Sequence, residues 1–96
     1  MLTYEKWSAD MKSFVYPAVL FEDKENNAYS IAIYDLSLFT SGDTVEDAHK
    51  NMADMLTEYF KMVVEFGFDY AEATPFNEMI ERFPKQLVVL VEAKIK

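Results

Sequence analysis

The sequence predicts an α+β domain in which a mostly antiparallel sheet is covered on one face by a long helix. Between residues 44 and 66, apolar residues recur every three or four positions, which is typical of an amphipathic helix of about six turns. Residues 14–41 contain three runs rich in β-branched and aromatic residues, and residues 86–95 form a fourth. The expected order of elements is therefore β-β-β-α-(short α)-β.

The long helix has a start signal and a stop signal. Gly42 permits a sharp turn, after which Thr44 with Asp47, or Asp43 with Glu46, has the spacing of an N-cap and its third-position carboxylate. At the other end, Gly67 is a common helix-stop residue. The sequence thus predicts a helix over residues 44–66.

Three strands are expected before this helix. The first is Phe14–Glu22, in which Pro17 lacks a backbone donor and so must face an unpaired edge or a bulge. Residues 23–27 form a polar turn, and Tyr29–Leu36 is the second strand of the hairpin. A short third strand at 38–41 leads into the glycine turn.

A short helix and a last strand are expected after Gly67. Residues 68–74 are a connector, and Pro75 is well placed to begin a helix over Phe76–Arg82, which Pro84 stops. The closing strand, Gln86–Ile95, is the most strand-like run of the chain.

The side of the sheet that faces away from the long helix is predicted to be unusually apolar. Sheet faces in water normally carry polar residues, so a patch of this size implies a cover. Residues 1–13, a second copy of the chain and another protein are the candidate covers. We expect a homodimer to supply part of it, through Tyr16, Ala18, Leu20, Val88 and Leu90. The expected apolar face also includes Ala32 and Tyr34.

Length and composition limit the possible functions. The 96 residues suffice for one domain, which we expect to consist of an N-terminal extension, 1–13, and an α+β domain, 14–96. The chain has no cysteine and a single histidine, His49, to which we assign a structural or surface role. No run of eighteen apolar residues is present, which favours a cytoplasmic protein. The net charge of −8 repels nucleic acid phosphates and attracts a basic partner.

Three short motifs follow one another between Tyr16 and Phe60. They are Tyr16–Val19 (YPAV) in the first strand, Tyr29–Leu36 (YSIAIYDL) after the polar turn, and Gly42–Ala48 (GDTVEDA) where the long helix begins. In this order and spacing, the chain resembles the HicB family of type II toxin–antitoxin antitoxins.

The resemblance implies a partial ribonuclease-H-like fold with no catalysis, metal or cofactor of its own. Members of this family bind and neutralise a HicA toxin, a small basic ribonuclease that cleaves messenger RNA. Many also continue into a C-terminal DNA-binding domain, whereas this chain ends at Lys96 on its last expected strand, so we do not expect it to bind operator DNA. The contact residues expected for a toxin are acids and aromatics near the hairpin and the sheet margin: Asp23, Glu25, Tyr29, Tyr34, Asp35 and Phe39.

Three other functions remain open from the sequence alone. A metal-dependent nuclease would need converging carboxylates, for which Asp23, Asp35 and Glu58 are the first candidates. A regulatory domain would need a closed, polar-lined pocket for a small ligand. A domain that only self-associates would use its acidic surface for solubility.

Overall fold

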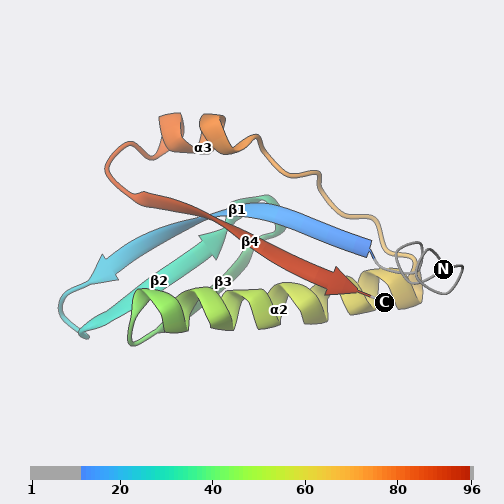
Figure 1. Ribbon diagram of the computed structural model, residues 1–96, viewed down its shortest axis with the longest axis horizontal. Helices are drawn as coiled ribbons and strands as arrows, with labels where there is room; N and C mark the ends of the chain where they lie inside the picture. Colours follow the sequence, from blue (N-terminus) through green and yellow to red (C-terminus); the bar gives the residue numbers. More distant parts are fainter. Residues whose placement is uncertain (1–11, 96) are drawn as a thin grey trace, which may run out of the picture.

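The computed structural model describes residues 12–95 of the chain. The four strands form one antiparallel sheet in the order β3-β2-β1-β4, with helices on both of its sides (Figure 1). The predicted α+β fold, with its element order, is confirmed. The elements are β1 (Lys12–Asp23), β2 (Ala28–Ile33), the 3₁₀ turn η1 (Tyr34–Leu36), β3 (Leu38–Gly42), α2 (Val45–Phe66), α3 (Phe76–Arg82) and β4 (Leu87–Ile95).

Helix α2 begins and ends where the sequence predicts. The Thr44 side chain accepts a hydrogen bond of 3.0 Å from the Asp47 amide, and Gly67 closes the helix with a φ of 70°. Gly42 is needed for a different reason from the one expected. Its backbone lies against that of Ala48, so that a Cβ atom at residue 42 would overlap the helix.

Helix α2 packs along one face of the sheet and forms the main core. Its buried residues are Ala48, Met52, Leu56, Phe60 and Val63. The helix also forms hydrogen bonds with both edge strands. The His49 ring lies 2.9 Å from the Leu90 carbonyl in β4, and the side-chain amide of Asn51 donates to the Ser41 carbonyl in β3. Part of each sheet edge is thereby covered, which limits pairing with another chain there.

The prediction that Tyr16, Ala18 and Leu20 face away from α2 is wrong. All three are buried in the core that α2 completes. Val88 and Leu90 do lie on the opposite face, because β1 pairs Val19 with Val88 and Pro17 with Leu90, and directly paired residues share a face. The face away from α2 therefore carries Val15, Pro17, Val19 and Phe21 of β1.

A short helix covers part of this second face, and it was not among the covers expected from the sequence. Met79 of α3 is buried against Val19 and Val88, and Phe21 and Phe83 pack around this small cluster. Figure 1 shows α3 on the side of the sheet opposite to α2. The predicted bounds of α3, Phe76–Arg82, are confirmed.

The connector from α2 to α3 is fixed at two points beside β1. The Tyr16 hydroxyl donates to the Ala71 carbonyl at 2.5 Å, and the Asp35 carboxylate accepts hydrogen bonds from the Thr74 amide and hydroxyl at 2.9 and 2.6 Å. The pairing between β1 and β2 ends at Val19, which is opposite Ala32. Pro17 lies past this point, so β2 does not need the backbone N–H donor that proline lacks.

Two strand ends differ from the expected bounds by more than one residue. Strand β2 ends at Ile33 rather than Leu36, because residues 34–36 form η1 and Ser37 adopts a left-handed φ of 56°. Strand β1 begins at Lys12, two residues before the expected start. The expected N-terminal extension is described only at Lys12 and Ser13, and its residues 1–11 lie outside the described residues.

Candidate protein-binding surface

A hollow lies on the α3 side of the sheet, over the β2–β3 half that α3 leaves open. Its volume is about 430 Å³. Strand pairing places five of its residues on one face, since Ala32 is opposite Phe39, and Ser30 is opposite both Phe21 and Ser41. We call it the aromatic hollow; its lining residues are Phe21, Ser30, Ile31, Ala32, Tyr34, Phe39, Thr40 and Ser41.

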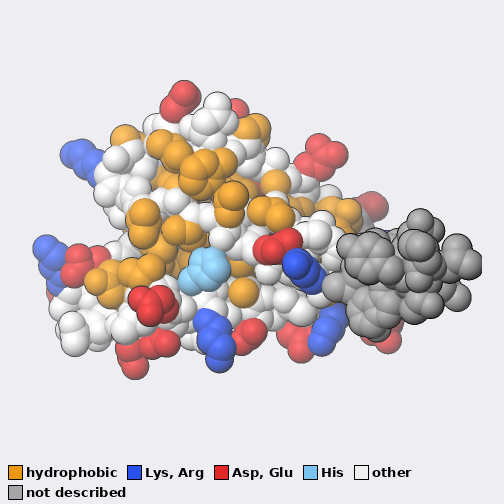
Figure 2. Space-filling view, viewed as in Figure 1, with side chains coloured by type: hydrophobic (Ala, Val, Ile, Leu, Met, Phe, Trp, Pro, Cys, Tyr) orange, Lys and Arg blue, Asp and Glu red, His pale blue; other side chains and the backbone are white. Residues whose placement is uncertain are grey.

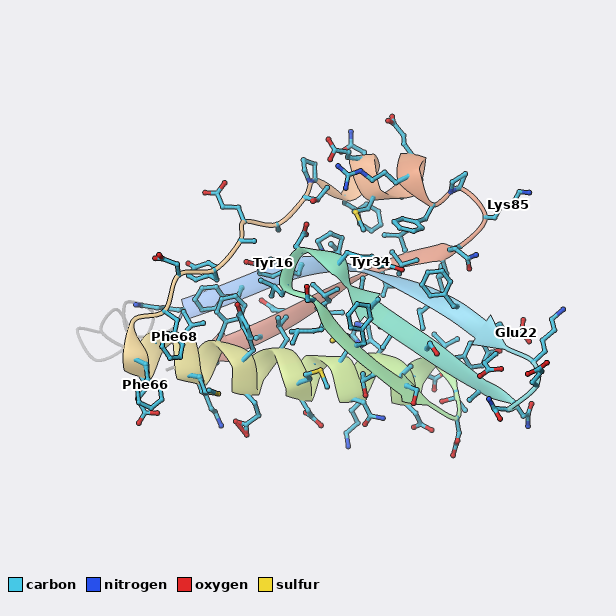
Figure 3. The ribbon with its side chains drawn as sticks, turned by 180° about the vertical axis from the view of Figure 1, so that it is seen from behind. Tyr16, Glu22, Tyr34, Phe66, Phe68 and Lys85 are labelled. Carbon is cyan, nitrogen blue, oxygen red and sulfur yellow. The ribbon has the colours of Figure 1, made fainter. Side chains whose placement is uncertain are left out.

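The aromatic walls of the hollow are positioned by Phe83, which follows α3. The Phe83 ring stacks on Tyr34 with centroids 5.3 Å apart, and it meets Phe21 edge to face at 6.3 Å. Tyr34 in turn contacts Phe39 edge to face at 5.9 Å. Among the described residues, no ring stacks on the face of Phe39, which is 58% exposed. Figure 3, drawn from behind, shows Tyr34 between the sheet and the α3 region.

The segment that bears the hollow is acidic. Residues 21–43 include five carboxylates and one lysine. Asp23 pairs with Ala28 and so lies on the same face as Phe21. Hydrogen bonds from the side chain and backbone of Asn26 lower the pKa of the Asp23 carboxyl, which keeps it negatively charged. The five acids are Glu22, Asp23, Glu25, Asp35 and Asp43.

The structure brings together some of the residues predicted to contact a partner. Tyr34 and Phe39 touch and line the hollow, Asp23 lies on the same face, and Glu25 is exposed in the β1–β2 turn. Tyr29 instead packs against the core under α2. The remaining residue, Asp35, is half-buried with its carboxylate bonded to Thr74, which gives it a structural role in holding the connector.

Sequence reasoning missed Phe21, Ser30, Ser41 and Phe83 as parts of this surface. Alternation along β1 could have placed Phe21 beside Asp23, since the two are separated by one residue. The pairing of Phe21 with Ser30 depends on the hairpin register, which the polar turn does not reveal. The position of Phe83 depends on how α3 docks on the sheet.

A second exposed apolar area lies on the same side of the sheet, around α3 and β4. We call it the α3–β4 patch and define it by Val15, Phe76, Ile80 and Leu90, of which Leu90 is 50% exposed. Figure 2 shows hydrophobic side chains gathered over α3 and β4. In contrast to the hollow segment, residues 76–95 carry three acids and three bases. Of the five residues predicted for a dimer interface, only Leu90 is exposed, because Tyr16, Ala18, Leu20 and Val88 are buried.

No group of three potential metal ligands lies close together in residues 12–95. The three candidate carboxylates of a nuclease site have separate surroundings. Asp23 accepts a hydrogen bond from Asn26, Asp35 accepts one from Thr74, and Glu58 is exposed on α2. Within the same range, neither helix has the length and hydropathy needed to cross a membrane. Within this described part of the chain, Asp23, Asp35 and Glu58 therefore do not form the carboxylate site that a metal-dependent nuclease requires.

These features define a small α+β domain whose antiparallel sheet has one face covered mainly by a long helix and the other face only partly covered. A family model described as "HicB_like antitoxin of bacterial toxin-antitoxin system" matches residues 16–96. The chain therefore belongs to the HicB-like antitoxin family, a membership that points to a non-enzymatic role.

Two solved structures share this fold. The N-terminal domain of Burkholderia pseudomallei antitoxin HicB superposes with a TM-score of 0.71 at 20% identity, covering 81% of this chain and 95% of that domain. A longer structure of the same antitoxin gives a TM-score of 0.72 at 19% identity, covering 83% of this chain and 62% of that one. A comparison with curated protein sequences found no match.

Proposed function

We propose that the chain is an antitoxin that binds and neutralises a small basic HicA-type toxin, a ribonuclease that cleaves messenger RNA. The observation that carries this proposal is the family match over residues 16–96. The action is direct protein–protein contact without catalysis by the antitoxin. Since the target of such a toxin is messenger RNA, we place the complex in the cytoplasm.

The aromatic hollow and its acidic segment are the proposed contact surface. Exposed aromatic side chains are frequent anchors of protein interfaces, and Tyr34 and Phe39 are 43% and 58% exposed. The carboxylates around them attract a basic nuclease, which speeds encounter and occupies the toxin surface that binds phosphates. Asp23 and Glu25 take part as charged rim residues, whereas Asp35 and Tyr29 support the fold.

The charge of this surface can be tested with two matched double variants. Glu25→Lys with Asp43→Lys reverses two exposed charges of the acidic segment that bears the hollow, and Glu58→Lys with Glu65→Lys makes the same change at exposed positions of α2. We expect the first pair to weaken toxin binding about tenfold, or 1.4 kcal/mol, at low salt, with less inhibition of RNA cleavage. The α2 pair should retain most of the affinity. Equal affinities for the two double variants would discard this surface.

We also propose that two copies of the chain associate through the α3–β4 patch. A chain with a net charge of −8 repels its copy, but residues 76–95 carry equal numbers of acids and bases and expose Phe76, Ile80 and Leu90. This region therefore opposes self-association least while offering apolar area to bury. It also leaves the aromatic hollow free for the toxin.

Sedimentation velocity tests the dimer without any toxin. The wild-type chain should sediment as a dimer at micromolar concentration, and Ile80→Glu should convert it to a monomer. Val64→Glu, at a similarly exposed apolar position on α2, is the control and should remain dimeric. A monomeric wild-type chain, or a dimeric Ile80→Glu variant, would contradict the proposal.

A further inference from the structure

The lining of the aromatic hollow combines ring surfaces with hydroxyl groups and contains no charged side chain. Phe21, Tyr34 and Phe39 supply the rings, and the side chains of Ser30 and Ser41, which share the face of Phe21 and Phe39, supply the hydroxyls. One face of the Tyr34 ring is already occupied by Phe83, whereas Phe39 is largely free. The hollow can therefore present an aromatic face and hydrogen-bond acceptors to the same inserted group.

We propose that the aromatic hollow receives an arginine side chain of the toxin. This inference rests on the proposed function, because it names what the basic partner inserts. A guanidinium group is planar, stacks on aromatic faces and carries five N–H donors that hydroxyl oxygens can accept.

The charge around the hollow favours a cation over a neutral apolar side chain. Its segment, residues 21–43, carries five carboxylates against one lysine, so the field at the hollow attracts positive charge. Asp23 remains ionised because Asn26 hydrogen bonds stabilise its carboxylate. A purely apolar anchor would gain nothing from this field.

The same features distinguish arginine from lysine. The lysine ammonium is a compact and strongly hydrated charge, and it loses more hydration energy on entering a ring-lined hollow than a guanidinium does. Its three donors also have no planar surface to lay against Phe39. We therefore expect the hollow to prefer arginine to lysine, and either of them to citrulline, which has the shape of arginine without its charge.

An NMR titration with single amino-acid probes tests the inference in the absence of any toxin. Nα-acetyl-arginine amide should shift the amide signals of Ser30, Phe39 and Ser41 and saturate in the millimolar range. Nα-acetyl-citrulline amide should bind at least tenfold more weakly, and the lysine derivative should fall between the two. The norleucine derivative, which is apolar and uncharged, should also bind at least tenfold more weakly than the arginine derivative.

Two variants check the role of the ring. Phe39→Leu keeps an apolar side chain of similar size but removes the aromatic face, and should weaken binding of the arginine derivative about threefold. Phe66→Leu, at a ring 61% exposed beyond the sheet at the end of α2, should have no effect. The amide spectrum of each variant shows whether its fold is retained.

The possible outcomes separate this inference from the proposed function. Absence of shifts at the hollow, or equal binding of the arginine and norleucine derivatives, would overturn the inference, and a toxin that still binds would leave the proposed function standing. If the arginine derivative binds selectively while a HicA-type toxin does not bind the chain, the cation selectivity stands but its assignment to a toxin is overturned.

Discussion

The two faces of the sheet are covered by helices of very different length. Helix α2, with 22 residues, spans one face and completes a core of thirteen buried residues. Helix α3, with seven residues, covers the other face only around Val19, Met79 and Val88. The difference teaches that the chain itself covers most of the first face, whereas on the second face it leaves the aromatic hollow and the α3–β4 patch exposed.

The largest effect is expected from a cavity under α2. Phe60 is fully buried and its ring contacts those of Phe14, Tyr16, Tyr59 and Tyr70. Phe60→Ala should lower the free energy of unfolding by about 3–5 kcal/mol, because the surrounding rings can close the cavity only in part. Urea denaturation followed by circular dichroism measures this loss. A change under about 1 kcal/mol would mean that the α2 face is not the main core.

A matching deletion under α3 should cost less. Met79 is 1% exposed, but its cluster is small and lies under a short helix that can shift to fill space. We expect Met79→Ala to lower the free energy of unfolding by about 2 kcal/mol. The same denaturation experiment applies. A loss as large as that of Phe60→Ala would show that the two faces contribute equally and would remove the contrast between them.

The third effect concerns the connector that joins the two helices. Burial, followed by the charges of Tyr70 and Tyr59, raises the pKa of the Tyr16 hydroxyl to about 12. An unfolded tyrosine titrates near pH 10, so the neutral phenol stabilises the fold fully below pH 10, and this contribution is lost as the pH rises to about 12. The loss is on the order of 2 kcal/mol.

Unfolding at several alkaline pH values measures this contribution. Tyr16→Phe removes the titrating hydroxyl and its hydrogen bond to the Ala71 carbonyl. Between pH 9 and 12, the wild-type chain should therefore lose about 2 kcal/mol more stability than the Phe variant. Parallel pH profiles for the two proteins would show that the Tyr16 hydroxyl does not titrate differently in the folded state.

The smallest effect is expected at the start of α2. The Thr44 side chain caps the helix through the Asp47 amide, so Thr44→Ala should cost about 1 kcal/mol. Asp43→Ala removes the other N-cap that the sequence allows, and it should cost clearly less. Thermal unfolding of both variants compares them directly. A larger loss for Asp43→Ala than for Thr44→Ala would show that Asp43, rather than Thr44, caps the helix.

Local signals in the sequence predicted most of the fold. The apolar stripe and the caps at Thr44 and Gly67 fixed the bounds of α2, and Pro75 and Pro84 delimited α3. The orientation of β1 could not be predicted in the same way. Residues 14–21 are apolar at every position, so alternation does not show which of them face α2. Only pairing with β4 decides this, and that pairing joins residues far apart in sequence.

The candidate site was predictable in part for the same reason. Tyr34 and Phe39 stood out as aromatics beside the expected third strand, and the structure places both in the hollow. The roles of Asp35 and Phe83 depend on where the connector and α3 cross the sheet, which follows from tertiary packing rather than from a local pattern. The cover that α3 provides was missed because its one buried residue, Met79, gives no recognisable stripe.

Amide hydrogen exchange of the chain, alone and saturated with a HicA-type toxin, tests most directly whether the open face is the binding surface. The account predicts slower exchange on toxin binding in β2 and β3, residues 28–42, with little change in α2. Protection confined to α2, with unchanged exchange in β2 and β3, would contradict it.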